Sequence, residues 1–249
     1  METQQSQQPT YQERQKLRHQ EKMKEDRQKK LKKLYRQFAL WLLLALVVGA
    51  GIFGMVKLAS RSPQDNGPVI TPGAVSAEDW IKGSNRDAKT VLIEYSDFQC
   101  PACAFYAPLL KKLSEEFGDK IVIAYRHFPL PQHQNAKSAA YAAEAAGRQG
   151  KFWDMHDLIF SNQTEWEGRK DADEIFISYA QTLNLNVDQF KTDFTSEEIR
   201  EKVEDAYQNS TSLKLNYTPT LFLNGEKLVN PKNYEDLRSI ITQALNENS

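Results

Sequence analysis

Two cysteines, three positions apart, are the side chains of this sequence that could carry out the most varied chemistry. Cys100 and Cys103 enclose Pro101 and Ala102 in the stretch SDFQCPACAF, and the 249-residue chain contains no other cysteine. Such a pair could cross-link the chain, provide half of a metal site, or act as a redox couple. The rest of the sequence discriminates among these three uses.

A metal site finds little support. A structural zinc ion usually takes four Cys or His ligands. Beyond the first 37 residues the only histidines are His127, His133 and His156, and they have no recognisable zinc-binding spacing with the cysteines. We therefore expect no metal ion, and nothing in the sequence requires an organic cofactor.

A structural cross-link is also disfavoured. A disulfide between residues three apart closes a very small loop and removes little conformational entropy from the unfolded chain. Small, strained disulfides are easily reduced, which suits exchange better than cross-linking.

The position of the pair favours redox chemistry. The residues TVLIEYSDF predict a buried strand, and CPACAFYAPLLKKLSEEFG predicts a helix that follows it directly. Cys100 then lies at the strand–helix junction, where Pro101 fits the first helical position. Unpaired N–H groups and the helix dipole would stabilise a Cys100 thiolate, the attacking species in thiol exchange. Cys103, one turn further along, would be more buried and would resolve the mixed disulfide.

The first 57 residues differ in composition from the rest. Residues 1–37 carry eleven Lys/Arg and five Asp/Glu, a net charge of +6, and we interpret them as a basic cytoplasmic tail. Residues 38–56 contain no charge and no proline. As a helix this run would extend about 28 Å, close to the thickness of a bilayer core. We predict a transmembrane helix at 38–57 that acts as an uncleaved signal-anchor, because the basic region is far too long for a cleaved signal peptide.

The flanking charges predict the orientation of this span. Six Lys/Arg lie in RQKKLKKLYRQ immediately before it, whereas only Lys57 and Arg61 follow it closely. Positive-inside reasoning puts the N-terminus in the cytoplasm and the rest of the chain outside the inner or plasma membrane. A disulfide can persist in that compartment. Nucleic acid is not an expected partner, because no aromatic residues are interleaved with most of the basic cluster.

The remaining residues predict a linker followed by one α/β domain. Residues 58–79 are rich in Pro, Gly and small polar residues, as in a linker. From 80 to 249 we expect the strand and helix around the cysteines, a second strand at KIVIAYRHF, and a helical region at about 133–215. A hairpin around Asn224-Gly225 and a closing helix at YEDLRSIITQAL complete the domain. The helix after the cysteines would carry an apolar stripe. Its members are Phe105, Leu109, Leu113 and Phe117.

These segments, in this order, resemble the thioredoxin superfamily, and most of all its DsbA-type, extracytoplasmic branch. The similarity rests on VLIEYSDFQCPAC, AYRHFPLP, AAEAAGRQGKFWDMHDLIF and NYTPTLFLNG, and covers roughly residues 80–247. It implies a thioredoxin fold with a helical insertion. It also implies a thiol:disulfide oxidoreductase that introduces or exchanges disulfides in exported proteins, with Cys100 and Cys103 as its redox-active disulfide. A membrane quinone-linked oxidase would then recycle it.

The resemblance implies roles for further residues. Glu94 matches a buried acid that would assist proton transfer at Cys103, and its apolar neighbours on both sides agree with burial. Thr218 and Pro219 match an element whose cis peptide bond would bring the Thr218 backbone beside the cysteines to hold an extended substrate. The Thr218 hydroxyl could also bond a sulfur. Pro108 matches a proline that kinks the helix.

At Ala102 the sequence departs from the best-known DsbA-type pattern, which has histidine after the proline. Without the imidazole the Cys100 pKa should be higher, and each pKa unit corresponds to about 1.4 kcal/mol. We therefore expect a milder oxidant than the His-containing relatives. The alternatives are a disulfide reductase or isomerase, and a membrane-tethered, non-catalytic thioredoxin-fold protein that binds or chaperones other proteins.

Overall fold

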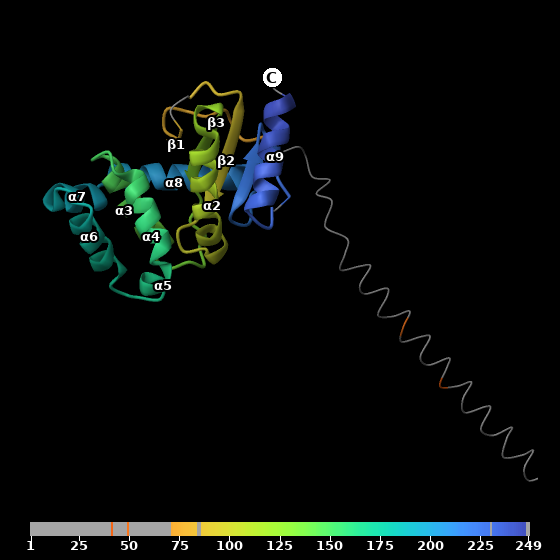
Figure 1. The fold of residues 1–249 in the computed structure, drawn as a ribbon. Coiled ribbons are helices and arrows are strands. Elements are labelled where there is room, and N and C mark those ends of the chain that lie inside the picture. Colours follow the sequence, from red (N-terminus) through yellow and green to blue (C-terminus); the bar gives the residue numbers. More distant parts are fainter. Residues whose placement is uncertain (1–40, 42–48, 50–70, 84–85, 230, 248–249) are drawn as a thin grey trace, which may run out of the picture. The chain divides into compact units, whose positions relative to one another are not determined.

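A five-stranded mixed sheet organises the computed structural model, which describes residues 41, 49, 71–83, 86–229 and 231–247 (Figure 1). Its strands, in spatial order, are β1 (Trp80–Lys82), β3 (Ile121–His127), β2 (Thr90–Ser96), β4 (Thr220–Leu223) and β5 (Glu226–Lys227). The central strands β2 and β3 run parallel, and the other neighbouring pairs are antiparallel. The sheet therefore has a parallel centre and antiparallel edges.

Strand β2 lies at the centre of the sheet and leads directly to the cysteines. Its sequence, TVLIEYS, is almost continuously buried, as expected of a strand that is covered on both faces. In the sheet register Glu94 lies between Tyr125 of β3 and Leu221 of β4. The only acid of this strand is thus held in the middle of the sheet.

Helix α2 (Pro101–Phe117) begins at the cysteine pair. Cys100 is its N-cap residue, with an extended backbone, and Pro101 occupies the start of the helix. Pro108 lies inside the helix, and Gly118 ends it with a φ of 57°, a conformation that favours glycine.

The apolar stripe predicted for this helix is partly wrong. Phe105 is 52% exposed, whereas its neighbours Tyr106 and Ala107 are buried, as are Leu110 and Leu113. The buried face is set by the sheet below α2 and by the helical insertion beside it. A stripe read at a spacing of four residues drifts away from this face because the helix has 3.6 residues per turn.

Helices cover both faces of the sheet. On one face α2 and α9 (Tyr234–Glu247) pack on β2, β3 and β4 through Leu92, Leu113, Ile123 and Leu237. On the other face α8 (Glu197–Ser212) and the segment that follows it cover Ile93, Ala124 and Phe222. The sheet is therefore the middle layer of three.

The helical insertion lies between β3 and β4. It comprises α3 (Ala136–Gly147), α4 (Phe152–Ser161), α5 (Gln163–Trp166), α6 (Ala172–Thr182), α7 (Val187–Phe194) and α8. Alanines on several sides of α3 are buried, so neighbouring helices can approach it closely. The core of the insertion continues to Phe98 and Cys103. The predicted thioredoxin fold with a helical insertion is confirmed.

The C-terminal hairpin also follows the prediction. Asn224 and Gly225 join β4 to β5 with φ values of 51° and 87°, as a type I′ turn requires. Strand β1, only three residues long, was not predicted. The segment before β1 is tied to the sheet by Arg126, which donates to both carboxylate oxygens of Asp79 and to the carbonyls of Gly73 and Ala74.

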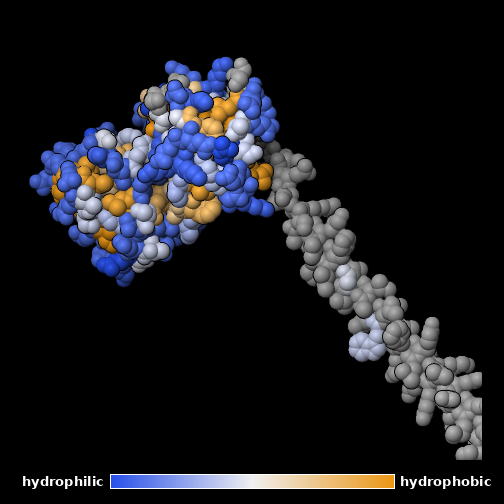
Figure 2. Space-filling view, in the orientation of Figure 1, coloured by the Kyte–Doolittle hydropathy of each residue, from blue (hydrophilic) through white to orange (hydrophobic). Residues whose placement is uncertain are grey.

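The predicted tail (1–37), the predicted span (38–57) except residues 41 and 49, and most of the predicted linker (58–79) lie outside the described residues. In the part of the chain that the structure does describe, none of the helices has both the length and the apolar character needed to cross a bilayer. The face of the domain shown in Figure 2 has several hydrophobic patches that lie between hydrophilic residues.

Candidate redox site

The two cysteines lie at the first turn of α2 with different exposure. Cys100 is 7% exposed and Cys103 is fully buried. The Cys100 backbone is fixed at both ends, because its N–H donates to the Asp97 carbonyl and its own carbonyl accepts from Ala104 N–H. Both side chains are thiols in this structure, so the disulfide between them stays a prediction.

The surroundings of the pair lower the pKa of the Cys100 thiol and raise the pKa of the Cys103 thiol. A hydrogen bond from the Cys103 thiol is the largest influence that lowers the pKa of Cys100 to about 5, and the backbone N–H groups of Cys103 and Ala102 act in the same direction. Burial raises the pKa of Cys103 well above its usual value, and its hydrogen bond to Cys100 and the nearby Glu94 charge reinforce this. These shifts favour a thiolate at Cys100 and a protonated thiol at Cys103 at neutral pH. The predicted difference in burial is present.

Thr218 and Pro219 lie beside the pair. Their peptide bond is cis, as the resemblance implied. The Cys100 sulfur lies 3.3 Å from the Thr218 carbonyl oxygen. A hydrogen bond with the Thr218 side chain is among the influences that lower the pKa of Cys100, in the direction expected of a hydroxyl that bonds the sulfur. Thr218 thus also places its backbone carbonyl beside the sulfur, and backbone is the part of a residue that can pair with an extended peptide.

Glu94 is buried below the cysteines, at 3% exposure. Burial raises the pKa of its carboxyl to about 7, while a hydrogen bond from Ser96 Oγ at 2.8 Å and the charge of Lys82 oppose that rise. A carboxyl with this pKa can both accept and release a proton near neutral pH. The predicted burial of Glu94 is confirmed.

Sequence reasoning missed Asp97, which joins the active-site loop to the loop after β3. Its backbone N–H donates to the Cys103 sulfur at 3.5 Å. Its buried carboxylate accepts from the N–H groups of Gln99 and Leu130 and from His133 Nδ1, each at 2.7 Å. Its place between the strand and the first cysteine was the only sequence signal.

Gln163, at the start of α5, was also missed. Its side-chain Nε2 donates to the carbonyls of Phe98 at 2.6 Å and Cys100 at 3.1 Å. No local pattern marks this glutamine, because it lies 63 residues after Cys100 and reaches the site only through the packing of the insertion.

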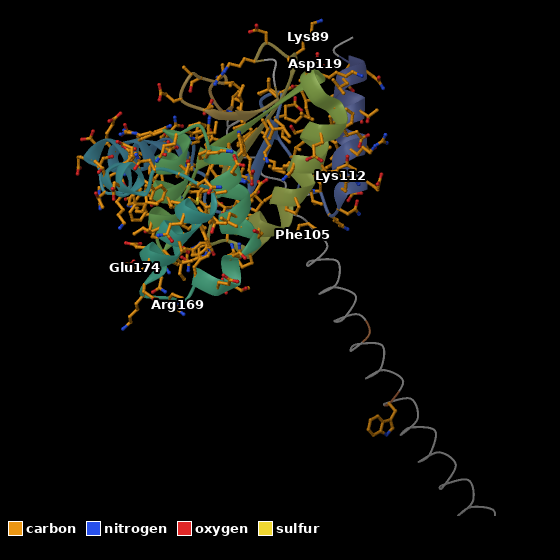
Figure 3. The ribbon with its side chains drawn as sticks, turned by 60° about the vertical axis from the view of Figure 1, so that its left-hand side comes forward. Lys89, Phe105, Lys112, Asp119, Arg169 and Glu174 are labelled. Carbon is orange, nitrogen blue, oxygen red and sulfur yellow. The ribbon has the colours of Figure 1, made fainter. Side chains whose placement is uncertain are left out.

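Exposed residues, some of them apolar, adjoin the two buried cysteines in the chain. Pro101 and Ala102 are exposed, and exposed Phe105 lies near the beginning of the same helix (Figure 3). Tyr217, next to Thr218, is 38% exposed. Among the residues that the structure describes, no group of three or more His, Cys, Asp or Glu side chains could hold a metal ion.

This combination of fold and site defines a thioredoxin-fold protein with a CxxC dithiol at a helix N-terminus. A family model described as thioredoxin matches residues 78–243. The chain therefore belongs to the thioredoxin family.

Curated relatives place similar sequence in longer chains. The chain is 35% identical over 185 residues to a Na⁺/H⁺ antiporter NhaA 1 of Mycolicibacterium vanbaalenii; the match covers 73% of this chain and 29% of that protein. A Na⁺/H⁺ antiporter NhaA 1 of Salinispora arenicola is 35% identical over 167 residues, covering 67% of this chain and 24% of that protein. The chain thus spans less than a third of the length of these relatives.

Solved structures share the fold at low sequence identity. BdbD of Bacillus subtilis, in its oxidised form, has a TM-score of 0.63 at 19% identity, with 72% of this chain and all of that chain covered. Wolbachia pipientis alpha-DsbA1 has a TM-score of 0.62 at 20% identity, with 70% and 94% covered. MdbA, a thiol-disulfide oxidoreductase from Corynebacterium diphtheriae, has a TM-score of 0.56 at 21% identity, with 73% and 96% covered.

Proposed function

We propose that this protein is a thiol:disulfide oxidoreductase that introduces disulfides into exported proteins through Cys100 and Cys103. The observation that carries the proposal is the placement of Cys100 at the N-terminus of α2 with the fully buried Cys103 one turn further in, an arrangement that lowers the pKa of Cys100 and raises that of Cys103. A stable Cys100 thiolate is a good leaving group and makes the disulfide form oxidising. Structural neighbours that are thiol-disulfide oxidoreductases support the same reaction class.

In the proposed reaction a substrate thiolate attacks the Cys100 sulfur of the Cys100–Cys103 disulfide. A bond forms between the substrate sulfur and Cys100, the disulfide breaks, and Cys103 leaves as a thiolate that takes a proton from Glu94. A second substrate thiolate then attacks the substrate sulfur of this mixed disulfide, and Cys100 leaves as its stable thiolate. The substrate has lost two electrons and the protein has gained them.

The substrate would be held as an extended strand against the backbone of Thr218 and Pro219. An extended peptide can pair with protein backbone by main-chain hydrogen bonds that do not depend on one sequence. Tyr217 and Phe105, both exposed near the thiols, provide apolar contact area for such a chain.

The location is part of the proposal. Residues 38–57 would anchor the chain in the inner or plasma membrane with residues 1–37 in the cytoplasm, and a membrane quinone-linked oxidase would take up the electrons. The basic flank of the apolar run supports this orientation.

Equilibration with glutathione tests both the activity and its direction. We expect the purified protein to exchange disulfides with glutathione and to hold its own disulfide weakly, as an oxidant does. Cys100→Ser should abolish exchange, and Cys103→Ser should accumulate a mixed disulfide at Cys100. A strongly reducing couple would overturn the oxidase assignment, and binding of unfolded substrates that survives in Cys100→Ser without any exchange in the native protein would overturn the enzyme assignment.

A further inference from the structure

Gln163 is a buried side chain of the insertion that donates hydrogen bonds to the backbone of the segment around the cysteines, at Phe98 and Cys100. It is 7% exposed, and its Nε2 serves two carbonyls, those of Phe98 and Cys100. A carboxamide nitrogen has two hydrogens, so each carbonyl can receive one. The pairing uses the full donor capacity of this group.

The two carbonyls differ in what else they bind. The Cys100 carbonyl also accepts the Ala104 N–H, as the first hydrogen bond of α2. Gln163 therefore provides a second donor to a carbonyl that already belongs to the helix, and the positive end of its dipole lies beside the Cys100 peptide unit. A carbonyl oxygen has two lone pairs and can accept from both donors at once.

Further amides extend this contact towards the surface. The Gln99 side chain donates to the Glu167 carbonyl and accepts from the Asn135 N–H. Asn135 Nδ2 in turn donates to the carbonyls of Trp166, Glu167 and Arg169. The segment before α2 is thus fastened to the α5 region by carboxamides, which do not titrate and which hold it equally at any pH.

We propose that Gln163 is a positioning residue for the thiol chemistry: by fixing the carbonyls of Phe98 and Cys100 it keeps the first-turn N–H groups of α2 directed at the Cys100 sulfur. The helical insertion then contributes to the reactivity of Cys100 as well as to the surface around it. The inference rests on the proposed redox function, which it deepens.

The test compares substitutions at Gln163 with the same substitutions at Gln134. Gln134 is an exposed glutamine whose side-chain amide donates to the Glu167 carbonyl and, in the part of the chain that the structure describes, makes no hydrogen bond to the cysteine segment. Gln163→Met removes both donors at similar size. We expect the midpoint of Cys100 thiolate absorbance to rise by about 0.5 to 1 pH unit, an about three- to ten-fold lower ionisation constant. The equilibrium with glutathione should shift towards the disulfide form of the protein by a similar factor. Gln134→Met should leave both quantities unchanged.

Gln163→Glu gives a second, independent readout. While protonated, its carboxyl keeps one donor hydrogen, so this variant can be folded at low pH even if the methionine variant fails to fold. When the carboxyl ionises it becomes an acceptor facing two carbonyls, and the Cys100 midpoint should rise further than with methionine. An unchanged midpoint in folded Gln163→Met or Gln163→Glu would overturn the inference while leaving the proposed function intact. An absence of glutathione exchange in the native protein would overturn the proposed function instead.

Discussion

Cys100 and Cys103 are identical side chains whose environments diverge within one helical turn. The sulfur of Cys100 receives a hydrogen bond from the Cys103 thiol and faces N–H groups of the first turn, and Cys103 is enclosed beneath it. Thiol exchange depends on this difference, because only a thiolate attacks and only a stable thiolate leaves readily. The contribution of the Cys103 thiol can be removed by a single substitution.

Replacing Cys103 isolates its hydrogen bond to Cys100. Cys103→Ala removes the donor, and we expect the pKa of Cys100 to rise clearly above about 5. Cys103→Ser keeps an O–H donor at the same place and serves as the matched control, with a smaller rise. The rate of alkylation by iodoacetamide, followed against pH, measures both midpoints without interference from a second thiol. Equal midpoints in the two variants would contradict the role of the Cys103 hydrogen bond.

Glu94 couples the site to folding stability. Because burial raises its pKa from 4.5 to about 7, the folded protein holds this proton more tightly than the unfolded chain. The resulting stabilisation is fully present below about pH 4.5 and is lost as the pH rises through 7. Glu94→Gln mimics the protonated form, so the reduced variant should be more stable at pH 8 by up to about 3 kcal/mol and nearly unchanged at pH 4.

Urea unfolding of the reduced protein at these two pH values measures the effect, with Glu115→Gln on the exposed side of α2 as the control. A stability gain that is the same at pH 4 and pH 8 would refute the raised pKa. Thiol exchange should be slower in Glu94→Gln, because amide groups cannot transfer the Cys103 proton.

At the scale of elements, a buried ion pair fastens the segment before β1 to the sheet. The side chains of Arg126 and Asp79 are 12% and 7% exposed and make two 2.7 Å contacts. Asp79→Ala leaves the guanidinium without its carboxylate, which should cost about 3–5 kcal/mol of unfolding free energy. The exposed pair Lys137–Glu204 is the control, and Glu204→Ala should cost less than about 1 kcal/mol.

Urea denaturation compares the two variants, and limited proteolysis reports on residues 71–78. Asp79→Ala should be cut there more readily while the Cys100 thiolate titration stays unchanged. Similar stability losses for the two variants would show that burial of the Arg126 pair does not strengthen it.

The elements that local pattern specifies were predicted well from the sequence. Strand β2 has a continuous apolar run, α2 has a proline at its start and a glycine at its end, and the Asn224-Gly225 turn has residues that tolerate positive φ. Strand β1 is too short for a pattern, and it forms because Trp80 and Lys82 pair with Tyr125 and Ile123 of β3.

The residues of the candidate site also fall into those that are close together in the sequence and those that only packing brings together. Cys100, Cys103 and Glu94 lie within ten residues on one strand–turn–helix unit, so their proximity follows from the chain itself. Gln163 and the Thr218 carbonyl reach Cys100 across 63 and 118 residues. Such contacts depend on how the insertion and β4 pack, which no local periodicity records. The exposure of Phe105 was missed for the same reason, since the face that α2 buries is chosen by its neighbours.

At the scale of the whole molecule, the chain joins a basic tail and an apolar run to a domain of opposite net charge. Beyond Lys57 there are 20 Lys/Arg and 28 Asp/Glu, a net charge of −8 against +6 in residues 1–37. Under the proposed orientation the positive tail faces the cytoplasm and the cysteines lie outside. The two cysteines make this testable in the intact chain, because no other residue can react with a maleimide as a thiol.

Protoplasts that express the full chain are treated with an impermeant reductant and then with a membrane-impermeant maleimide. We expect labelling at Cys100 without lysis, since Cys100 has a lowered pKa and keeps 7% exposure, and none in Cys100→Ser, since Cys103 is fully buried. Cys103→Ser should label like the native chain, which controls for expression and access. Labelling that requires lysis would contradict the proposed orientation. Recovery of the unlabelled chain in the soluble fraction would contradict the proposed membrane anchor. Because an exported thiol can meet Cys100 only on the outer side, the substrate class proposed for this site depends on this result.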